Sequence, residues 1–180
     1  MHIVLCDDDQ AFLVQLEAYL RDYFDASCLP QPEYELFLSG QTLLDQAEKN
    51  SDWRPDIAFL DVEMPGISGI EIGVRLQRRN PYAKLFIVTS YADYLDEAMR
   101  FHVFRYLSKP LDKDRLFRNM KDALYQLSVD TRSILILTLE GTITRFTDEI
   151  VVAETMGRKV VLRAVDGEYV SLQSMKHWET

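Results

Sequence analysis

Three separated fragments of the chain end an apolar, strand-like run in residues that can do chemistry. In chain order these residues are Asp7-Asp8-Asp9, Asp61 and Lys109-Pro110. Carboxylates that are brought close together repel one another, and a bound cation relieves the repulsion. Mg²⁺ suits such a site best, because it takes hard oxygen ligands and shares its remaining positions with waters and a phosphate. These residue types therefore predict one acidic pocket that binds a divalent cation and is suited to phosphoryl chemistry.

The same chemistry assigns roles around the pocket. A carboxylate beside Mg²⁺ can attack a phosphorus centre and form an acyl phosphate. Thr89 follows another apolar run and offers a hydroxyl to a phosphoryl oxygen, while Lys109 supplies a compact positive charge. The backbone carbonyl of Glu63, just past Asp61, is a further oxygen ligand for the ion.

Each of these residues, taken alone, has a commoner structural role. A strand-terminal Asp is more often a helix N-cap, and Asp8 or Asp9 is a candidate cap for the first helix. A single Lys-Pro pair is usually a solvated turn. The fixed order of Asp-Asp, Asp, Thr and Lys-Pro at four strand ends favours a functional site over four unrelated turns.

Composition bounds the class of protein. The 180 residues carry a net charge of −9, which argues against DNA binding by the chain as a whole, because phosphate contacts need a local excess of Lys and Arg. The acidity is concentrated in residues 1–127, and the remainder has no basic stripe. There is no apolar run of about 18 residues and no secretory segment, so we expect a cytoplasmic protein without membrane contact. Cys6 and Cys28 are expected to be buried, reduced thiols.

Up to residue 127 the chain alternates short apolar runs with amphipathic segments, which is typical of βα units around a parallel sheet. The expected strands are Ile3–Cys6, Glu33–Phe37, Ile57–Leu60, Leu85–Val88 and Arg105–Leu107. Two helices show a buried face with four-residue spacing, at Phe12, Leu16, Leu20 and Phe24 and at Leu116, Met120 and Leu124. Five strands and five helices predict an α/β fold with a doubly wound five-stranded parallel sheet. Ligands of such sheets bind beyond the carboxyl ends of the strands, which places Asp7, Asp8, Asp61, Thr89 and Lys109 on one rim.

A different pattern follows residue 127. The polar stretch 128–133 is expected to be a linker, and residues 134–180 to form a small antiparallel β segment. Its strands are expected at 134–139, 143–146, 150–155, 159–165 and 169–172. The intervening pairs Glu140-Gly141, Met156-Gly157 and Asp166-Gly167 are turn signals, of which Asp-Gly is the strongest for a hairpin. Residues 174–180 suggest the first turns of a helix.

Residues 1–127 resemble the receiver domain of two-component response regulators, of which the chemotaxis protein CheY is the simplest example. The resemblance rests on Ile3-Val-Leu-Cys-Asp-Asp-Asp, Asp56-Ile-Ala-Phe-Leu-Asp-Val-Glu-Met-Pro-Gly-Ile-Ser-Gly, Phe86-Ile-Val-Thr-Ser and Tyr106-Leu-Ser-Lys-Pro. It implies a CheY-like sheet of strand order 2-1-3-4-5 and a chain that is not an enzyme beyond its own phosphorylation and dephosphorylation.

The resemblance also implies the roles of single residues. Asp61 would accept a phosphoryl group from a sensor histidine kinase, and Asp8, Asp61 and the backbone carbonyl of Glu63 would bind Mg²⁺. Asp7 would act on the ion through a water. Lys109 and Thr89 would hold the phosphoryl group, and the Lys109-Pro110 peptide bond would be cis.

A conformational switch belongs to the same resemblance. Thr89 would move toward the phosphoryl group and Tyr106 would swing inward, which biases the face made by the fourth helix, the fifth strand and the fifth helix toward homodimerisation. The alternative for Tyr106 is an ordinary half-buried strand tyrosine. The pair His102-Val103 stands where the family often has Gly-Ala, which stiffens the loop before the fifth strand. The Glu63 side chain and Ser90 flank the pocket.

Residues 134–180 resemble, less specifically, the first half of a LytTR-type DNA-binding domain. This resemblance rests on Asp148-Glu-Ile-Val-Val-Ala-Glu, on the turns at Gly157 and Asp166-Gly167, and on Tyr169-Val-Ser-Leu-Gln-Ser-Met. It implies a partial, apparently truncated output domain that controls transcription, with promoter DNA as a partner only if the domain is complete. No DNA-contacting residue is assigned; Arg158 and Lys159 are weak loop candidates whose simpler interpretation is a solvated hairpin tip.

Two alternatives to a transcriptional regulator remain open. The first is a stand-alone receiver that acts by protein contact, with residues 134–180 as a dimerisation strip. The second is a phosphatase of the haloacid-dehalogenase type, since Asp61, Glu63, Thr89 and Lys109 mimic its nucleophile, its second acid, its hydroxyl and its lysine. Chain order speaks against the phosphatase, because its nucleophile strand comes first and its acidic pair last.

Overall fold

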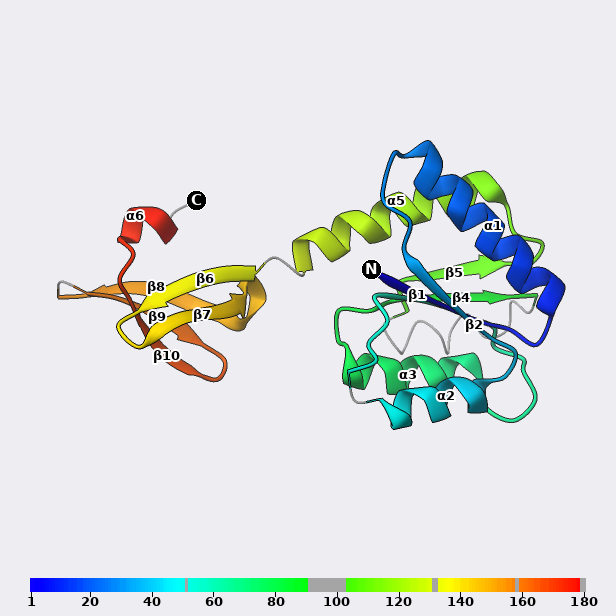
Figure 1. The fold of residues 1–180 in the computed structure, drawn as a ribbon, viewed down its shortest axis with the longest axis horizontal. Coiled ribbons are helices and arrows are strands. Elements are labelled where there is room, and N and C mark those ends of the chain that lie inside the picture. Colours follow the sequence, from blue (N-terminus) through cyan, green and yellow to red (C-terminus); the bar gives the residue numbers. More distant parts are fainter. Residues whose placement is uncertain (51, 91–102, 131–132, 158, 179–180) are drawn as a thin grey trace. The chain divides into compact units, whose positions relative to one another are not determined.

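A computed structural model describes residues 1–180 except 51, 91–102, 131–132, 158 and 179–180 (Figure 1). Two compact units divide the chain, the first from Met1 to Leu127 and the second from Ser128 to Thr180. Among the described residues, no helix is both long and apolar enough to cross a lipid bilayer.

The first unit is built on a parallel sheet of five strands. These are β1 (His2–Cys6), β2 (Glu33–Phe37), β3 (Ile57–Leu60), β4 (Lys84–Thr89) and β5 (Arg105–Ser108). Their spatial order is β2-β1-β3-β4-β5, and every neighbouring pair is parallel. This confirms the expected fold class, a doubly wound sheet followed by a small antiparallel segment.

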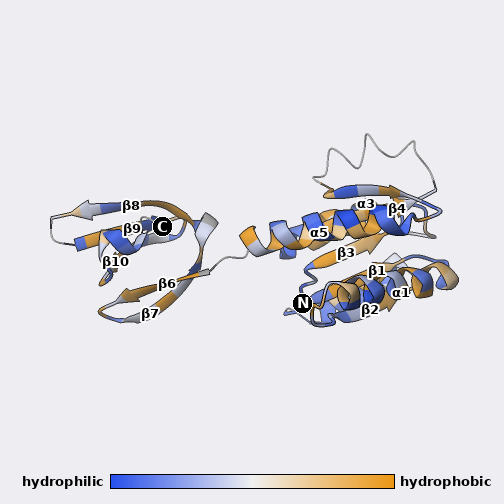
Figure 2. Ribbon diagram, turned by 90° about the horizontal axis from the view of Figure 1, so that it is seen from above, coloured by the Kyte–Doolittle hydropathy of each residue, from blue (hydrophilic) through white to orange (hydrophobic). Residues whose placement is uncertain are grey.

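Helices cover both faces of this sheet. The described helices of the first unit are α1 (Gln10–Ala26), α2 (Gly40–Lys49), α3 (Gly69–Arg79) and α5 (Lys113–Asp130). One core cluster joins the sheet to α1 and α5 and another joins it to α2 and α3, in agreement with the two layers seen in Figure 1. Strand β3 is therefore buried on both sides, which explains its uninterrupted apolar sequence (Figure 2). The expected fourth helix falls in residues 91–102, outside the described residues.

Helix α1 buries Leu16, Leu20 and Phe24 as expected, and Phe12 is the exception in the expected stripe. Its buried residues are Leu13, Leu16, Leu20, Tyr23 and Phe24, whereas Phe12 is only partly buried at the border of the core. A strict four-residue repeat turns by about 40° per step relative to a helix of 3.6 residues per turn, so a stripe cannot follow it for three steps. Leu13 therefore takes the fully buried position, and Phe12 packs at the border of the same core.

The second unit is antiparallel, as expected. Its strands are β6 (Ser133–Thr138), β7 (Gly141–Phe146), β8 (Ile150–Met156), β9 (Lys159–Ala164) and β10 (Gly167–Ser171), and a short 3₁₀ turn (Thr147–Glu149) lies between β7 and β8. The first two form a hairpin and the last three a meander, with the Asp-Gly turn between β9 and β10. The chain ends in the short helix α6 (Met175–Trp178), where the sequence suggested helical turns.

Two details differ from the sequence-based expectations. Helix α5 runs to Asp130 and β6 begins at Ser133, so the stretch 128–133 is mostly helix end and strand start rather than linker. Ser128 is exposed in the last turn of α5, where a polar residue needs no apolar face. Cys6 is buried, but Cys28 is exposed, because it lies in the turn beyond the end of α1, where its φ of 53° is left-handed.

Candidate functional site

Strand register brings the acidic residues to one edge of the sheet. Cys6 pairs with Leu60 at the ends of β1 and β3, and Thr89 pairs with Ser108 at the ends of β4 and β5. The next residues in the chain, Asp7, Asp61 and Lys109, therefore leave the sheet side by side. Carboxylate oxygens of Asp7, Asp8 and Asp61 all lie within 4.8 Å of one another. The rim expected from the sequence is present in the structure.

Lys109 joins two of these carboxylates. Its Nζ lies 2.6 Å from Oδ2 of Asp7 and donates a hydrogen bond of 2.9 Å to Oδ2 of Asp61. Its backbone N–H donates to the carbonyl of Thr89 at 2.9 Å, which continues the sheet pairing for one residue beyond β5. The Lys109-Pro110 peptide bond is cis, as the family resemblance implied.

Burial shifts the pKa of ionisable groups in this cluster. Asp7 and Asp61 are 2% and 6% exposed, whereas Asp8 is exposed to solvent. Burial raises the pKa of the Asp7 carboxyl, and hydrogen bonds from Lys109 and the Asp9 backbone only partly offset this. Burial alone would lower the pKa of Lys109, but its hydrogen bonds and charge interactions with Asp61 and Asp7 outweigh it and raise the pKa. One ammonium thus partly compensates three carboxylates, and the excess charge is negative.

The site fits a hard divalent cation. Oδ1 of Asp61 is buried and makes no hydrogen bond with any described residue. A buried carboxylate oxygen without a partner is costly, and a metal ion is one way to satisfy it. Asp8 offers an exposed carboxylate beside it, and the set of donors is all oxygen, which Mg²⁺ prefers.

Asp9 sets the start of α1 and not the metal cluster. Its side chain caps the helix by accepting hydrogen bonds from the backbone N–H groups of Ala11 and Phe12, at 2.9 and 3.2 Å. Its own N–H donates to Oδ1 of Asp7 at 3.0 Å. Of the two cap candidates, the structure selects Asp9, so the Asp8 side chain stays with the acidic cluster.

Gly69 is the positioning residue that sequence reasoning missed. It opens α3, behind the Ser68 N-cap, and a Cβ built on it would lie 2.0 Å from the carbonyl oxygen of Asp61. The helix therefore starts in contact with the backbone that carries the central carboxylate. From the other side, the Asp61 N–H donates to the carbonyl of Cys6 at 2.9 Å. The only signal in the sequence was the spacing of Gly69 behind Asp61, which does not by itself show a close approach.

The remaining predicted residues lie at different depths. Thr89 is 1% exposed at the last position of β4, Tyr106 is partly buried in β5, and Ser90 and Glu63 are exposed beside the pocket. Tyr106 and Val103 pack against the core shared with α2 and α3. Lys159 is an exposed residue at the start of β9. His102 and Arg158 lie outside the described residues.

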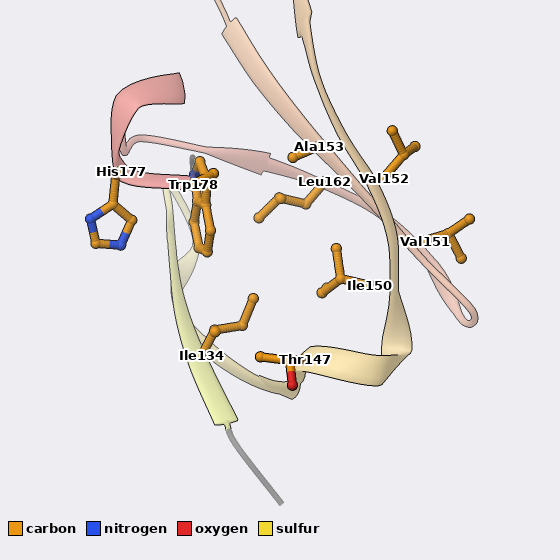
Figure 3. A pocket seen from close by; sticks show the side chains of 9 residues that line it. All are labelled: Ile134, Thr147, Ile150, Val151, Val152, Ala153, Leu162, His177 and Trp178. Carbon is orange, nitrogen blue, oxygen red and sulfur yellow. The ribbon is translucent and has the colours of Figure 1, made fainter. Parts of the chain in front are cut away.

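A pocket of the second unit is mainly apolar and differs in kind from the acidic rim. It has a volume of about 520 Å³, and Ile134, Ile150, Leu162 and Trp178 point into it (Figure 3). Its lining contains no carboxylate and only one ionisable group, His177. The acidic rim of the first unit is therefore the better candidate for chemistry.

Comparison with known proteins identifies the family. The family described as "Response regulator receiver domain" matches residues 3–121, more than half of the chain, so the chain belongs to this family. An uncharacterised response regulatory protein of Vibrio cholerae is 30% identical over 116 residues, which are 64% of this chain and 48% of that protein. The transcriptional regulatory protein BtsR of Escherichia coli K12 is 36% identical over 83 residues, 46% of this chain and 34% of BtsR. The chain thus spans about half the length, or less, of the curated relatives it matches.

Solved structures agree on the fold. A CheY-like receiver protein of Methanospirillum hungatei has a TM-score of 0.60 at 21% identity, over 71% of this chain and 95% of that chain. A response regulator of Chloroflexus aurantiacus has a TM-score of 0.56 at 25% identity, over 69% and 97%. The family match favours a two-component receiver over the haloacid-dehalogenase alternative. The family match ends at residue 121, within α5.

The contact between Gly69 and Asp61 gives a test of how the site is held. Gly69→Ala should lower the free energy of unfolding by about 1–3 kcal/mol, because the new methyl group meets a backbone carbonyl that cannot move aside cheaply. Urea unfolding measures this loss. Gly73→Ala in the same helix is the matched control, since its Cβ would meet a movable methyl of Leu85 at 2.9 Å. Equal costs at the two glycines would contradict the proposed role of Gly69.

Proposed function

We propose that the chain is a phospho-acceptor switch of a two-component system, in which Asp61 receives a phosphoryl group from a sensor histidine kinase. The observation that carries this proposal is the buried cluster of Asp7, Asp61 and Lys109 at the strand ends of a receiver fold. A carboxylate held by a lysine beside further acidic oxygens has the groups that an acyl phosphate and its counter-charges need.

Asp61 is the proposed acceptor because its two oxygens lie in different environments. Oδ2 is held by Lys109, whereas buried Oδ1 makes no hydrogen bond with the described residues. Mg²⁺, held by Asp8, Asp61 and the Glu63 carbonyl with Asp7 acting through water, would supply charge neutralisation for the incoming phosphoryl oxygens. In that state Lys109 would exchange a carboxylate oxygen for a phosphoryl oxygen, and the Thr89 hydroxyl would bind another.

The second unit is proposed to carry the signal from the receiver domain to its target. BtsR, a relative of this chain, is named a transcriptional regulatory protein, and we propose that this chain also controls transcription, through residues 134–180 as part of a LytTR-type domain. Binding of promoter DNA then depends on a complete output domain. The stand-alone alternative, output by protein contact, uses the same receiver chemistry. The chain itself is proposed not to be an enzyme for external substrates.

Phosphorylation of Asp61 is tested directly by intact mass measurement after incubation with acetyl phosphate and Mg²⁺. The wild-type chain should gain one phosphoryl group, and Asp61→Asn should gain none, because the amide cannot form the acyl phosphate. Asp22→Asn, which changes an exposed aspartate of α1, should be modified like the wild type. Modification that persists in Asp61→Asn would assign the acceptor to another residue.

Binding of Mg²⁺ should stabilise the fold. At about 100 times its dissociation constant, the ion should add about 2.7 kcal/mol to the free energy of unfolding, and Asp8→Asn should lose most of this gain.

Protons compete with Mg²⁺ for the carboxylates of the site. Because burial raises the pKa of Asp7 above its ordinary value of 3.8, the affinity for Mg²⁺ should begin to fall at a higher pH than for ordinary aspartates as the solution is acidified. Calorimetric titration at several pH values measures this, and an affinity that rises on acidification would contradict it.

The proposed switch predicts a change of assembly. With Mg²⁺ and beryllofluoride, a mimic of the phosphoryl group, the mass in solution should shift from monomer to dimer, and Asp61→Asn should remain a monomer under the same conditions. Light scattering after size-exclusion chromatography measures both. An unchanged mass in the wild type would remove the dimerisation step while leaving the acceptor chemistry in place.

A further inference from the structure

Phe12 lies outside the buried stripe of α1 and its ring lies against the ammonium group of Lys109. The Nζ atom of Lys109 is 4.4 Å from the ring centroid and lies over the ring. From this geometry we infer that Phe12 is a positioning residue for Lys109, which keeps the ammonium beside Asp61 while the carboxylates exchange partners. This inference rests on the proposed phospho-acceptor function.

The neighbours of the ammonium explain why a ring is useful at this place. A lysine ammonium has three N–H donors. In the structure Asp7 and Asp61 lie at 2.6 and 2.9 Å, and the face of Phe12 is a third neighbour. The negative face of an aromatic ring attracts a cation, and the attraction grows when the cation is withdrawn from water. The Lys109 side chain is 17% exposed, so this contact is partly desolvated.

The three neighbours differ in what the reaction does to them. In the proposed mechanism Asp61 would acquire the phosphoryl group and Asp7 would help to hold Mg²⁺ through water, so both carboxylate contacts with Lys109 would weaken. The Phe12 ring is neither a metal ligand nor a phosphoryl acceptor. The reaction changes neither the charge nor the bonding of the ring, so the ring can hold Lys109 on the Asp61 side of the pocket in both states.

The ring is itself held in place from two directions. The backbone N–H of Phe12 donates to the N-cap carboxylate of Asp9 at 3.2 Å, which fixes the residue in the first turn of α1. Its side chain packs against the core that contains Leu16 and Phe59. Phe12 also lines, with Asp7 and Asp61, a crevice at the base of the acidic cluster. A ring fixed in this way is a pre-organised surface for the cation and not a flexible cover.

The test compares Phe12→Leu, which keeps an apolar side chain without a ring, with Phe12→Tyr, which keeps the ring face. The rate of phosphorylation by acetyl phosphate at saturating Mg²⁺ should fall about fivefold in Phe12→Leu and stay within about twofold of the wild type in Phe12→Tyr. The affinity for Mg²⁺ should be unchanged in both variants, because Phe12 offers no oxygen to the ion. Tyr19→Leu is the matched control: it removes from the same helix a ring that lies 5.3 Å from Lys113, outside the pocket, and should keep the wild-type rate.

A second measurement reports on the contact itself. In NMR spectra, the methylene protons next to the Lys109 ammonium should show an upfield ring-current shift in the wild type and in Phe12→Tyr, and the shift should disappear in Phe12→Leu. It should persist when Mg²⁺ and beryllofluoride are added. A shift that vanishes on this addition, or a Phe12→Tyr variant as slow as Phe12→Leu, would overturn the inference.

The two measurements separate this inference from the proposed function. If the wild type accepts no phosphoryl group, the proposed function fails, and the ring-current shift still decides whether Phe12 holds the ammonium. If the wild type is phosphorylated and Phe12→Leu is phosphorylated equally fast, only the positioning role of Phe12 fails.

Discussion

The first unit depends on one electrostatic problem, the burial of two carboxylates within reach of a third at the edge of a parallel sheet. Desolvation of Asp7 and Asp61 disfavours their charged forms, and a single ammonium offers the only described cationic contact to them. Such an arrangement contributes little to the stability of the fold, but it suits a site whose net charge would change on the proposed phosphorylation of Asp61. The cost is offset by the apolar sheet, in which β3 and β4 are buried along their whole length and β1 is buried from Ile3 to Cys6.

Few residues are needed to bring the side chains of the site together. Parallel strands end at the same edge, so three residues that follow β1, β3 and β5 converge without any long-range signal in the sequence. Helix starts then fix the backbone around them. Asp9 caps α1 directly after the acidic pair, and Gly69 lets the start of α3 touch the backbone of Asp61. Each functional side chain is thus held by an element that begins or ends within a few residues of it.

The sequence was sufficient to predict the features that depend on where strands end. It did not predict the features that depend on a close tertiary contact between segments. The apolar runs that end at Cys6 and Leu60 predicted both the fold and the acidic rim, because burial on two faces leaves a strong pattern. Leu16, Leu20 and Phe24 are buried as predicted, but Phe12 is only partly buried, because a four-residue repeat drifts by about 40° per step around a helix of 3.6 residues per turn. The Gly69 contact and the exposure of Cys28 depend on tertiary packing and on one left-handed residue, and neither leaves a periodic signal.

In the second unit, the sequence predicts the turns but not which face of a strand is buried. Its hairpins were predictable from Gly-containing turns, but strand β6 is apolar on both faces, with Ile136 fully buried and Leu135 and Leu137 exposed by 56% and 42%. Alternation therefore does not reveal which face of β6 belongs to the core. In the structure Ile136 lies on the buried face of β6, and the pairing with β7 and the hydrogen bond that the Leu172 N–H donates to the carbonyl of Leu137 hold the strand in place.

The crevice beneath the acidic cluster has a consequence for the duration of a signal. It is lined by Leu13, Leu16, Phe59 and Val88 in addition to the residues of the site, and it leaves no room for a water molecule. Under the proposed chemistry, a water that hydrolyses an acyl phosphate on Asp61 would therefore arrive from the solvent-exposed side of the site, where Asp8 lies. The core would then exclude water from one side of the acyl phosphate, and the exposed residues at the edge of the site would set its rate of hydrolysis. Substitutions at the surface would change the lifetime of the phosphorylated state without changing the core.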